Sequence, residues 1–205
     1  EFVTYNTFRE AAILKALSKH PCLPTLFFEP VIMGDEMTLV MEKCEMNLKS
    51  YSRFDLKEQD LISISIGIFT GLKFLHSQCI IHRDIKPENI GINPNKHGEQ
   101  DFVMILDFGF STVITDSNEL DSGFKLEVVE ETKNRLPKGS KKDLKMSCNV
   151  YARWYRPPEV CMIVAYSSHR SLPPQLKMYD YKADMWAAGC CIVELFMDGI
   201  FLKSG

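Results

Sequence analysis

Two short polar clusters hold the side chains of this chain that could carry out chemistry. They are the run His82-Arg83-Asp84-Ile85-Lys86-Pro87-Glu88-Asn89 and the triplet Asp107-Phe108-Gly109. The Asp84 carboxylate can accept a proton from an attacking hydroxyl, and Lys86 can neutralise charge on a moving phosphoryl group. Asn89 and Asp107 offer the hard oxygen ligands that Mg²⁺ prefers. Together these residue types supply what the transfer of a phosphoryl group from ATP requires.

Apolar runs beside both clusters predict the strands that position them. Residues 80–81 and 90–92 flank the first cluster, and residues 102–106 lead directly into Asp107. A long amphipathic helix is predicted over residues 57–78, because apolar side chains recur there at helical spacing. Its apolar face is formed by Leu61, Ile64, Ile68, Leu72 and Leu75.

The outer elements follow from the same periodicities and from turn residues. We expect a helix over 7–18, a hairpin of strands 26–31 and 37–41 around Gly34-Asp35, a short helix over 46–52, a long loop over 111–148, an irregular stretch over 167–180 and a last helix over 182–197. A few strands followed mostly by helices predict an α+β fold.

The composition excludes several classes of protein. A net charge of −3 argues against a general nucleic-acid binder. The seven cysteines form no C-x-x-C pair, so free thiols in a reducing cytosol or nucleus are expected. The longest apolar stretch, residues 183–202, is interrupted by three acidic residues and therefore predicts a buried helix, with no membrane span. Because the chain starts with Glu1, we expect it to be a piece of a longer protein.

The two clusters resemble the catalytic core of eukaryotic-type protein kinases, in the serine/threonine branch, because Lys86 stands two residues after Asp84. The resemblance extends over about residues 7–203. It implies a two-lobe fold with a truncated small lobe. Residues 1–44 are then the part of the small lobe that runs from the start of the C-helix through strands 4 and 5, together with the hinge. Residues 45–205 are then the mainly helical large lobe up to its central helix, with an activation segment at 107–159.

The resemblance assigns roles to the two clusters. Asp84 is the base that orients the attacking hydroxyl, and Asn89 and Asp107 hold two magnesium ions that bridge the phosphates of ATP. His82 is expected to pack beside Phe108 with Leu14 and Leu26. Asp184 is expected to anchor the backbone of the His82 run as a buried carboxylate.

Other resemblances concern the nucleotide site. Glu10 matches the helix glutamate that pairs with an ATP-binding lysine. Met41 corresponds to the gatekeeper behind the adenine, and backbone groups of Glu42 and Cys44 are expected to bond the adenine edge. Gly91 stands where the family has an apolar side chain beneath adenine, which weakens nucleotide packing or admits a bulkier ligand.

The end of the activation segment resembles the group of cyclin-dependent and mitogen-activated kinases, whose members often prefer proline after the target residue. The expected substrate platform consists of Arg153, Trp154, Arg156 and Glu159. Ser147 is a candidate activating phosphosite whose phosphate could be received by Arg83 and Arg9, and an unmodified loop serine is the alternative.

Departures from the family leave more than one function open. The 205 residues contain no glycine-rich phosphate loop and no lysine strand, so we expect this segment alone not to turn over ATP. Ala152 replaces a threonine that bridges the catalytic aspartate and lysine in relatives. The first hypothesis is therefore an ATP- and Mg²⁺-dependent serine/threonine protein kinase. The alternatives are a kinase-like scaffold with little phosphotransfer and, third, a small-molecule kinase.

The expected partners follow from the kinase hypothesis. They are a protein substrate with a serine or threonine acceptor and, because Arg9-Glu10 resembles a cyclin-binding helix, a cyclin-like or other regulatory subunit; no nucleic acid and no membrane are expected. The expected location is intracellular, in the cytoplasm, the nucleus or both.

Overall fold

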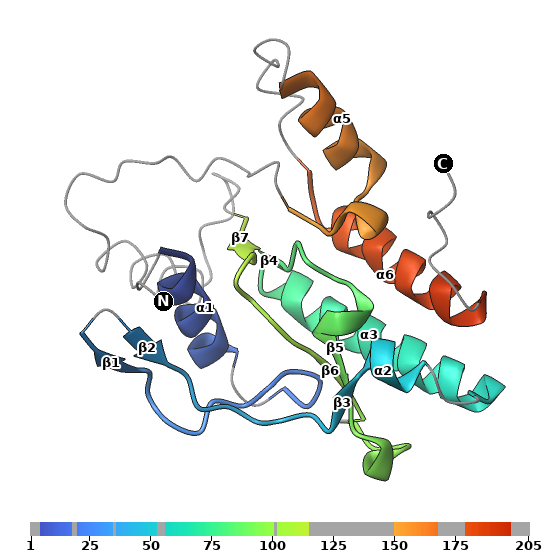
Figure 1. Ribbon diagram of the computed structural model, residues 1–205, viewed down its shortest axis with the longest axis horizontal. Helices are drawn as coiled ribbons and strands as arrows, with labels where there is room; N and C mark the ends of the chain where they lie inside the picture. Colours follow the sequence, from blue (N-terminus) through green and yellow to red (C-terminus); the bar gives the residue numbers. More distant parts are fainter. Residues whose placement is uncertain are drawn as a thin grey trace.

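Figure 1 shows the computed structural model of the chain. The structure describes residues 5–17, 20–34, 36–52, 56–100, 102–114, 150–167 and 179–197. Helices and short strands alternate over these residues, which confirms the expected mixture of both. None of the described helices is both long and apolar enough to cross a membrane.

The first part of the chain consists of helix α1 (Tyr5–Ala16) and a hairpin of strands β1 (Val31–Met33) and β2 (Glu36–Thr38). The pairing of β1 with β2 confirms the expected hairpin, although Asp35 of its turn lies outside the described residues, and the extents predicted for its strands are wrong. Residues 26–31 do not form one strand, because Pro30 has no N–H group for a ladder. Before Pro30 the pairing is reduced to a bridge between Leu26 and Met41, with the Phe27 N–H donating to the Val40 carbonyl at 2.9 Å.

The middle of the chain builds a small antiparallel sheet against a long helix. Strands β3 (Met46–Asn47), β5 (Ile90–Ile92) and β6 (Val103–Ile105) pair in the order β3-β5-β6. Helix α2 (Leu48–Tyr51) begins directly after β3, and helix α3 (Glu58–Ser77) packs beside β6. A side chain at Gly71 would place its Cβ 2.7 Å from Ile105 Cδ1, so glycine allows this close approach of helix and strand.

The predicted apolar face of α3 is confirmed. The buried side chains are Ile64, Ile68, Leu72 and Leu75, while Leu61 is only partly buried. The side chain of Asp60 accepts the Lys57 N–H at 2.8 Å, which satisfies a backbone donor at the start of the helix. Residues of α3 also contact helix α6 (Lys182–Phe196), so this helix supports both the sheet and α6 (Figure 1).

Two elements differ from expectation in the second half. Strand β7 (Thr112–Val113) lies in the segment expected to be a loop, and it pairs with β4 (Ile80–Ile81). Helix α5 (Pro158–Ser167) was missed, although Pro158 at its first position and the apolar run after it are a usual start signal. Most of the expected loop at 111–148 and of the irregular stretch at 167–180 lies outside the described residues.

Candidate active site

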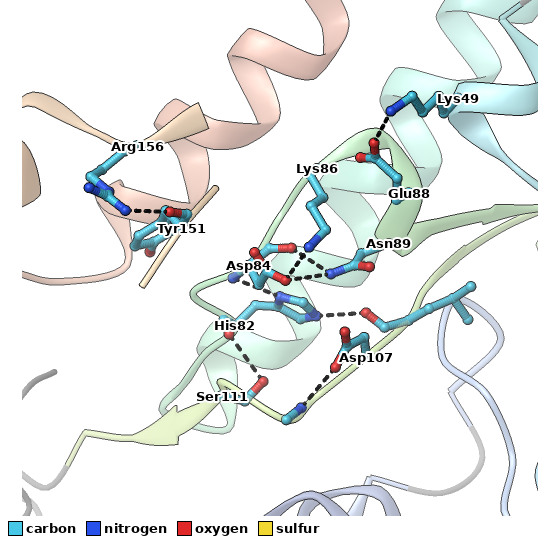
Figure 2. A network of polar contacts seen from close by, with 12 residues as sticks. Lys49, His82, Asp84, Lys86, Glu88, Asn89, Asp107, Ser111, Tyr151 and Arg156 are labelled. Carbon is cyan, nitrogen blue, oxygen red and sulfur yellow. Dashed lines mark hydrogen bonds and ion pairs between the residues drawn. The ribbon is translucent and has the colours of Figure 1, made fainter. Parts of the chain in front are cut away.

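The His82 run brings three of the predicted catalytic side chains into direct contact. Oδ2 of Asp84 accepts hydrogen bonds from Lys86 Nζ at 2.7 Å and from Asn89 Nδ2 at 2.9 Å (Figure 2). Asn89 Nδ2 also donates to the Asp84 carbonyl at 2.9 Å, so the amide oxygen is the atom of Asn89 that could ligate a metal. A carboxylate held by a cation and an amide is fixed in one orientation before any substrate arrives.

The run ends in a short 3₁₀ helix, Pro87–Asn89, which leads directly into β5. Pro87 is pre-set for the first helical position, and Glu88 on the same turn pairs with Lys49 of α2 (Figure 2). The run is thereby held between the end of β4 and the start of β5. The sequence predicted both strands with their bounds correct.

Asp184 of α6 anchors the start of the run, as predicted. Its carboxylate is inaccessible to solvent and accepts the backbone N–H groups of His82 at 2.8 Å and Arg83 at 2.9 Å. His76 Nε2 and the Tyr151 hydroxyl lie 3.0 Å and 2.9 Å from the same carboxylate. Burial alone would raise the pKa of Asp184, but the hydrogen bond from His76 and the backbone N–H groups of Arg83 and His82 hold the pKa below its usual value.

The Asp107 triplet lies beside the run because β5 and β6 are neighbours. The Leu106 N–H donates to the Asn89 carbonyl at 2.8 Å, which fixes the following residue, Asp107, next to Asn89. Asp107 has a φ of 64° and its Oδ1 accepts the Gly109 N–H at 3.1 Å (Figure 2). A non-glycine residue in this left-handed conformation is strained, and such residues cluster at functional sites.

The triplet is also held by α1. Arg9 Nη2 donates to the Gly109 carbonyl at 2.9 Å. Burial, and then the charge of Asp107, raise the pKa of Glu10, although a hydrogen bond to the Phe108 backbone opposes this. A partly desolvated carboxylate beside a second carboxylate favours the approach of a cation, which fits the lysine partner expected for Glu10.

A magnesium ion fits this arrangement with help from a ligand. Among the residues that the structure describes, no group of three or more His, Cys, Asp or Glu side chains could hold a metal by itself. Mg²⁺ usually takes one or two protein carboxylates and completes its shell with water and substrate phosphates. The Asp107 carboxylate and the Asn89 amide oxygen match that pattern, so they would hold the metal together with a phosphate.

His82 has a packing role, and its protonation is expected to lower the free energy of unfolding. Its ring contacts Phe108 edge-on with centroids 5.2 Å apart, as predicted, while Nε2 donates to the Leu106 carbonyl at 3.0 Å. Nδ1 faces the Asp84 N–H at 3.3 Å and therefore carries no proton. Burial lowers the pKa of His82 from the ordinary 6.5 despite the nearby charge of Asp184.

The free energy of unfolding is therefore expected to fall as the pH decreases below about 6.5, because the unfolded chain binds a proton at His82 that the folded protein refuses. The slope from this group is at most about 1.4 kcal/mol per pH unit. Urea unfolding at about pH 7.5 and about pH 5.5 measures it, in the parent and in His82→Gln, with His97→Gln as the partly exposed control. Equal losses of stability in the parent and His82→Gln would contradict this assignment.

The residues expected around the adenine lie where the hairpin meets the sheet. Met41 is partly buried and packs against the core, and the Glu42 N–H is taken by the Thr25 carbonyl at 2.9 Å, which leaves the Glu42 carbonyl as its backbone group for a ligand. Cys44 Sγ approaches Met104 Sδ at 3.3 Å, across the strand that contains Gly91.

The space above Gly91 is not open, which contradicts the expectation that this glycine admits a bulkier ligand. A Cβ at Gly91 would lie 2.3 Å from Cys44 Sγ and 3.0 Å from Leu106 Cδ1. The Cys44 side chain therefore fills the space that the family gives to the side chain at position 91. The sequence could not indicate this, because the two residues are 47 positions apart (91 − 44).

We expect Gly91→Ala to destabilise the protein by about 1–3 kcal/mol, the usual cost of overpacking a filled site. Cys44→Gly removes the Sγ and Cβ atoms of Cys44, which would lie 2.3 Å and 2.9 Å from the new Cβ, so the double variant should recover most of the loss. A double-mutant cycle of denaturant midpoints measures the coupling. Additive effects of the two changes would show that Cys44 does not occupy this space.

The predicted substrate platform follows Val150. Arg153 lies over the Trp154 ring with 5.5 Å between its Cζ atom and the ring centroid, and both residues belong to a 3₁₀ helix, Arg153–Tyr155. Arg156 donates to the carbonyls of Val150 at 3.1 Å and Tyr151 at 3.0 Å (Figure 2). Glu159 lies in the first turn of α5. Ser147 lies outside the described residues, so its role as a phosphosite stays a prediction.

Two residues of this site were missed by sequence reasoning. They are His76 and Tyr151, which both bond the Asp184 carboxylate. His76 occupies the last turn of α3, where a histidine is unremarkable. Tyr151 has a φ of 60°, which no sequence signal indicated.

The chain resembles known proteins along nearly its whole length. A family model described as "Protein kinase domain" matches residues 3–204. "Putative mitogen-activated protein kinase 14C" of Drosophila melanogaster is 27% identical over 97% of this chain and 45% of its own length. "Cyclin-dependent kinase D-1" of Arabidopsis thaliana is 28% identical over 99% of this chain and 41% of its own length. The chain thus spans less than half of either relative.

A similar fold occurs among solved structures. One chain of "Crystal Structure of the yeast RNA Pol II CTD kinase CTDK-1 complex" superposes with a TM-score of 0.69 at 20% identity. The match covers 99% of this chain and 53% of that chain.

Proposed function

The chain belongs to the protein kinase domain family, in which it resembles the cyclin-dependent and mitogen-activated group, and has a truncated form of the two-lobe kinase fold; we propose that the complete protein transfers the γ-phosphate of ATP to serine or threonine hydroxyls of protein substrates. One observation carries this proposal. The carboxylate of Asp84 is bound by Lys86 and Asn89 while Asp107 is fixed beside Asn89.

Each of these side chains has a task in the proposed reaction. Asp84 orients the substrate hydroxyl and accepts its proton, and Lys86 neutralises charge on the transferred group. Asn89 and Asp107 would hold magnesium, which supplies charge neutralisation at the phosphate oxygens. Glu10 would position the ATP-binding lysine of the complete protein.

The geometry around Arg156 supports a preference for proline after the target residue. The Tyr151 carbonyl would be an acceptor for the backbone N–H of that substrate residue, but Arg156 Nη2 already donates to it at 3.0 Å. A residue with an N–H would bury an unpaired donor there, whereas proline has none. We therefore propose that the kinase is proline-directed.

Arg156→Met is expected to relax this preference, because it releases the Tyr151 carbonyl. The ratio of kcat/KM for a peptide with proline after the target residue to that for its alanine counterpart should fall about fivefold or more, the cost of one unpaired donor. Steady-state kinetics on the two peptides measure the ratio, with Lys182→Met, which removes an exposed cation outside the platform, as the control. An unchanged ratio in Arg156→Met would contradict this reading of the site.

The second candidate function is a kinase-like scaffold that binds partners with little phosphotransfer. Ala152 favours it, because the threonine that bridges the catalytic aspartate and lysine in relatives is absent. The upstream sequence discriminates between the two: a glycine-rich loop followed by a lysine strand supports the enzyme, and their absence from the full reading frame supports the scaffold.

The deciding experiment measures phosphate transfer from labelled ATP by the complete kinase domain to peptides that differ only in having serine, threonine or tyrosine as the acceptor before a proline. We expect label on serine or threonine, dependent on Mg²⁺ and absent in Asp107→Asn. Equal label with the parent domain and with Asp107→Asn would refute the enzyme and leave the scaffold.

The partners and location are part of the proposal. We propose a protein substrate and, since relatives include a cyclin-dependent kinase and the similar structure is a kinase complex, a cyclin-like or other regulatory subunit that contacts α1. ATP-dependent phosphorylation is proposed to occur inside the cell, in the cytoplasm, the nucleus or both.

A further inference from the structure

Tyr151 adopts a conformation that its sequence neighbours do not explain. Its φ is 60°, and the residue is only 3% exposed. A bulky residue in the left-handed region is an outlier that persists only where surrounding contacts impose it. The contacts at Tyr151 therefore indicate what holds this segment in place.

The backbone of Tyr151 joins two parts of the site. Its N–H donates to the Arg83 carbonyl at 2.8 Å, directly before Asp84. Its own carbonyl accepts from Arg156, the residue to which we assign the proline preference. Figure 2 shows Tyr151 and Arg156 together, across from the run that contains Asp84. Residue 151 thus lies between the substrate platform and the catalytic base.

The side chain of Tyr151 adds a buried bond to the same region. The hydroxyl donates to Asp184 Oδ1 at 2.9 Å, and that same oxygen accepts the Arg83 N–H. Burial, followed by the charge of Asp184, raises the pKa of Tyr151 far above its ordinary value, so the hydroxyl remains a donor at any physiological pH. A hydrogen bond to a buried charge is among the stronger ones.

A second tyrosine completes the cluster. The rings of Tyr151 and Tyr179 meet edge-on with centroids 6.3 Å apart. The Tyr179 hydroxyl accepts from Arg83 Nη1 at 3.1 Å, and Arg83 Nε donates to the Phe110 carbonyl at 2.6 Å. Tyr151 thus contacts Asp184, which holds the Arg83 backbone, and Tyr179, which holds the Arg83 guanidinium.

The neighbouring residue, Ala152, lacks the hydroxyl with which a threonine would connect this segment to Asp84 and Lys86. On the basis of the proposed kinase function, we propose that Tyr151 is a positioning residue that replaces that connection. It seats the substrate platform on the catalytic run through the Arg83 carbonyl and the Asp184 carboxylate. Nothing in this role requires Tyr151 to touch substrate.

Tyr151→Phe in the complete kinase domain tests this role. It removes only the hydroxyl, and we expect kcat/KM for the peptide to fall about tenfold or more, with the KM for ATP unchanged. Adding Ala152→Thr should restore most of the loss in Tyr151→Phe while changing the parent little. A purely structural defect would not be rescued by a hydroxyl at the neighbouring position.

The chain provides a matched control. The Tyr155 hydroxyl also donates to a carboxylate, Glu194 Oε2 at 2.6 Å, but towards the far end of α6 from Asp184. Tyr155→Phe should lower the unfolding temperature without lowering kcat/KM for the peptide. Unchanged kinetics in Tyr151→Phe, no rescue by Ala152→Thr, or an equal kinetic loss in Tyr155→Phe would each overturn the proposal.

A second readout separates this proposal from the kinase function on which it rests. Hydrogen exchange at the amides of Arg83 and Tyr151 should be faster in Tyr151→Phe than in the parent or in Tyr155→Phe, and slower again with Ala152→Thr. If the parent transfers no phosphate but exchange is faster in Tyr151→Phe than in the parent, the proposed function fails and the positioning role of Tyr151 stands. Unchanged exchange overturns the positioning role whether or not phosphate is transferred.

Discussion

Replacement of Asp84 by asparagine in the complete kinase domain is expected to lower kcat by about 10²–10⁴, the usual worth of a general base. Asparagine keeps the size of the side chain and can still accept a hydrogen bond from Lys86 or Asn89. It carries no negative charge and cannot take the proton of the attacking hydroxyl. The KM for ATP should change little, because Asp84 is assigned to the acceptor hydroxyl and has no assigned contact with the nucleotide.

Steady-state phosphorylation of a serine peptide measures this change. Glu58→Gln is the control, because it neutralises an exposed carboxylate in the first turn of α3. A full rate in Asp84→Asn would remove Asp84 from the reaction. An equal loss of rate in both variants would mean that the change in net charge lowers the rate, and that Asp84 has no special role in the site.

The second large effect is expected from Asp184→Ala, which should lower the free energy of unfolding by about 3–5 kcal/mol. The substitution leaves the buried N–H groups of His82 and Arg83 without their acceptor and removes the partner of Tyr151 and His76. Buried donors that lose their acceptor bear the full cost of desolvation. Activity should be lost together with stability, since the same bonds fix the backbone before Asp84.

Denaturant unfolding measures this loss, and Asp60→Ala is the matched control. Asp60 is a partly buried carboxylate that accepts one backbone N–H and pairs with His97, so about 1 kcal/mol is expected. Because the pKa of Asp184 is lowered in the folded state, its contribution is fully present above its unfolded pKa of about 3.9 and is lost as the pH falls through the folded pKa. A loss in Asp184→Ala no larger than in Asp60→Ala would contradict the anchoring role.

The sequence predicted those parts of the site that depend on contiguous residues. The run at 82–89 and the triplet at 107–109 each follow directly after an apolar stretch. The strands β4 and β5 occur where expected. The local alternation of apolar and polar residues determines such elements, so a single sequence is enough to place them.

The remaining features depend on contacts between distant residues or on backbone strain. Cys44 lies above Gly91 because the strand that follows it, β3, pairs with β5, and Tyr151 bonds an aspartate 33 positions further along the chain from a positive φ. The apolar pattern of residues 26–31 predicted a strand there, although Pro30 is a local signal against one. The observed strand β1 begins only after this proline. Helix α5 was not predicted, because only its first two residues, Pro158 and Glu159, belong to the kinase motif and no element was assigned to the apolar run that follows.

The most direct test of the proposed site is a crystal structure of the complete kinase domain with Mg²⁺ and a non-hydrolysable ATP analogue. We predict that Asp107 and the Asn89 amide oxygen lie about 2.0–2.1 Å from magnesium, which also contacts the phosphates, and that the Asp84 carboxylate faces the terminal phosphate. A nucleotide bound elsewhere, or a metal held without Asn89 and Asp107, would contradict this site and the function proposed from it.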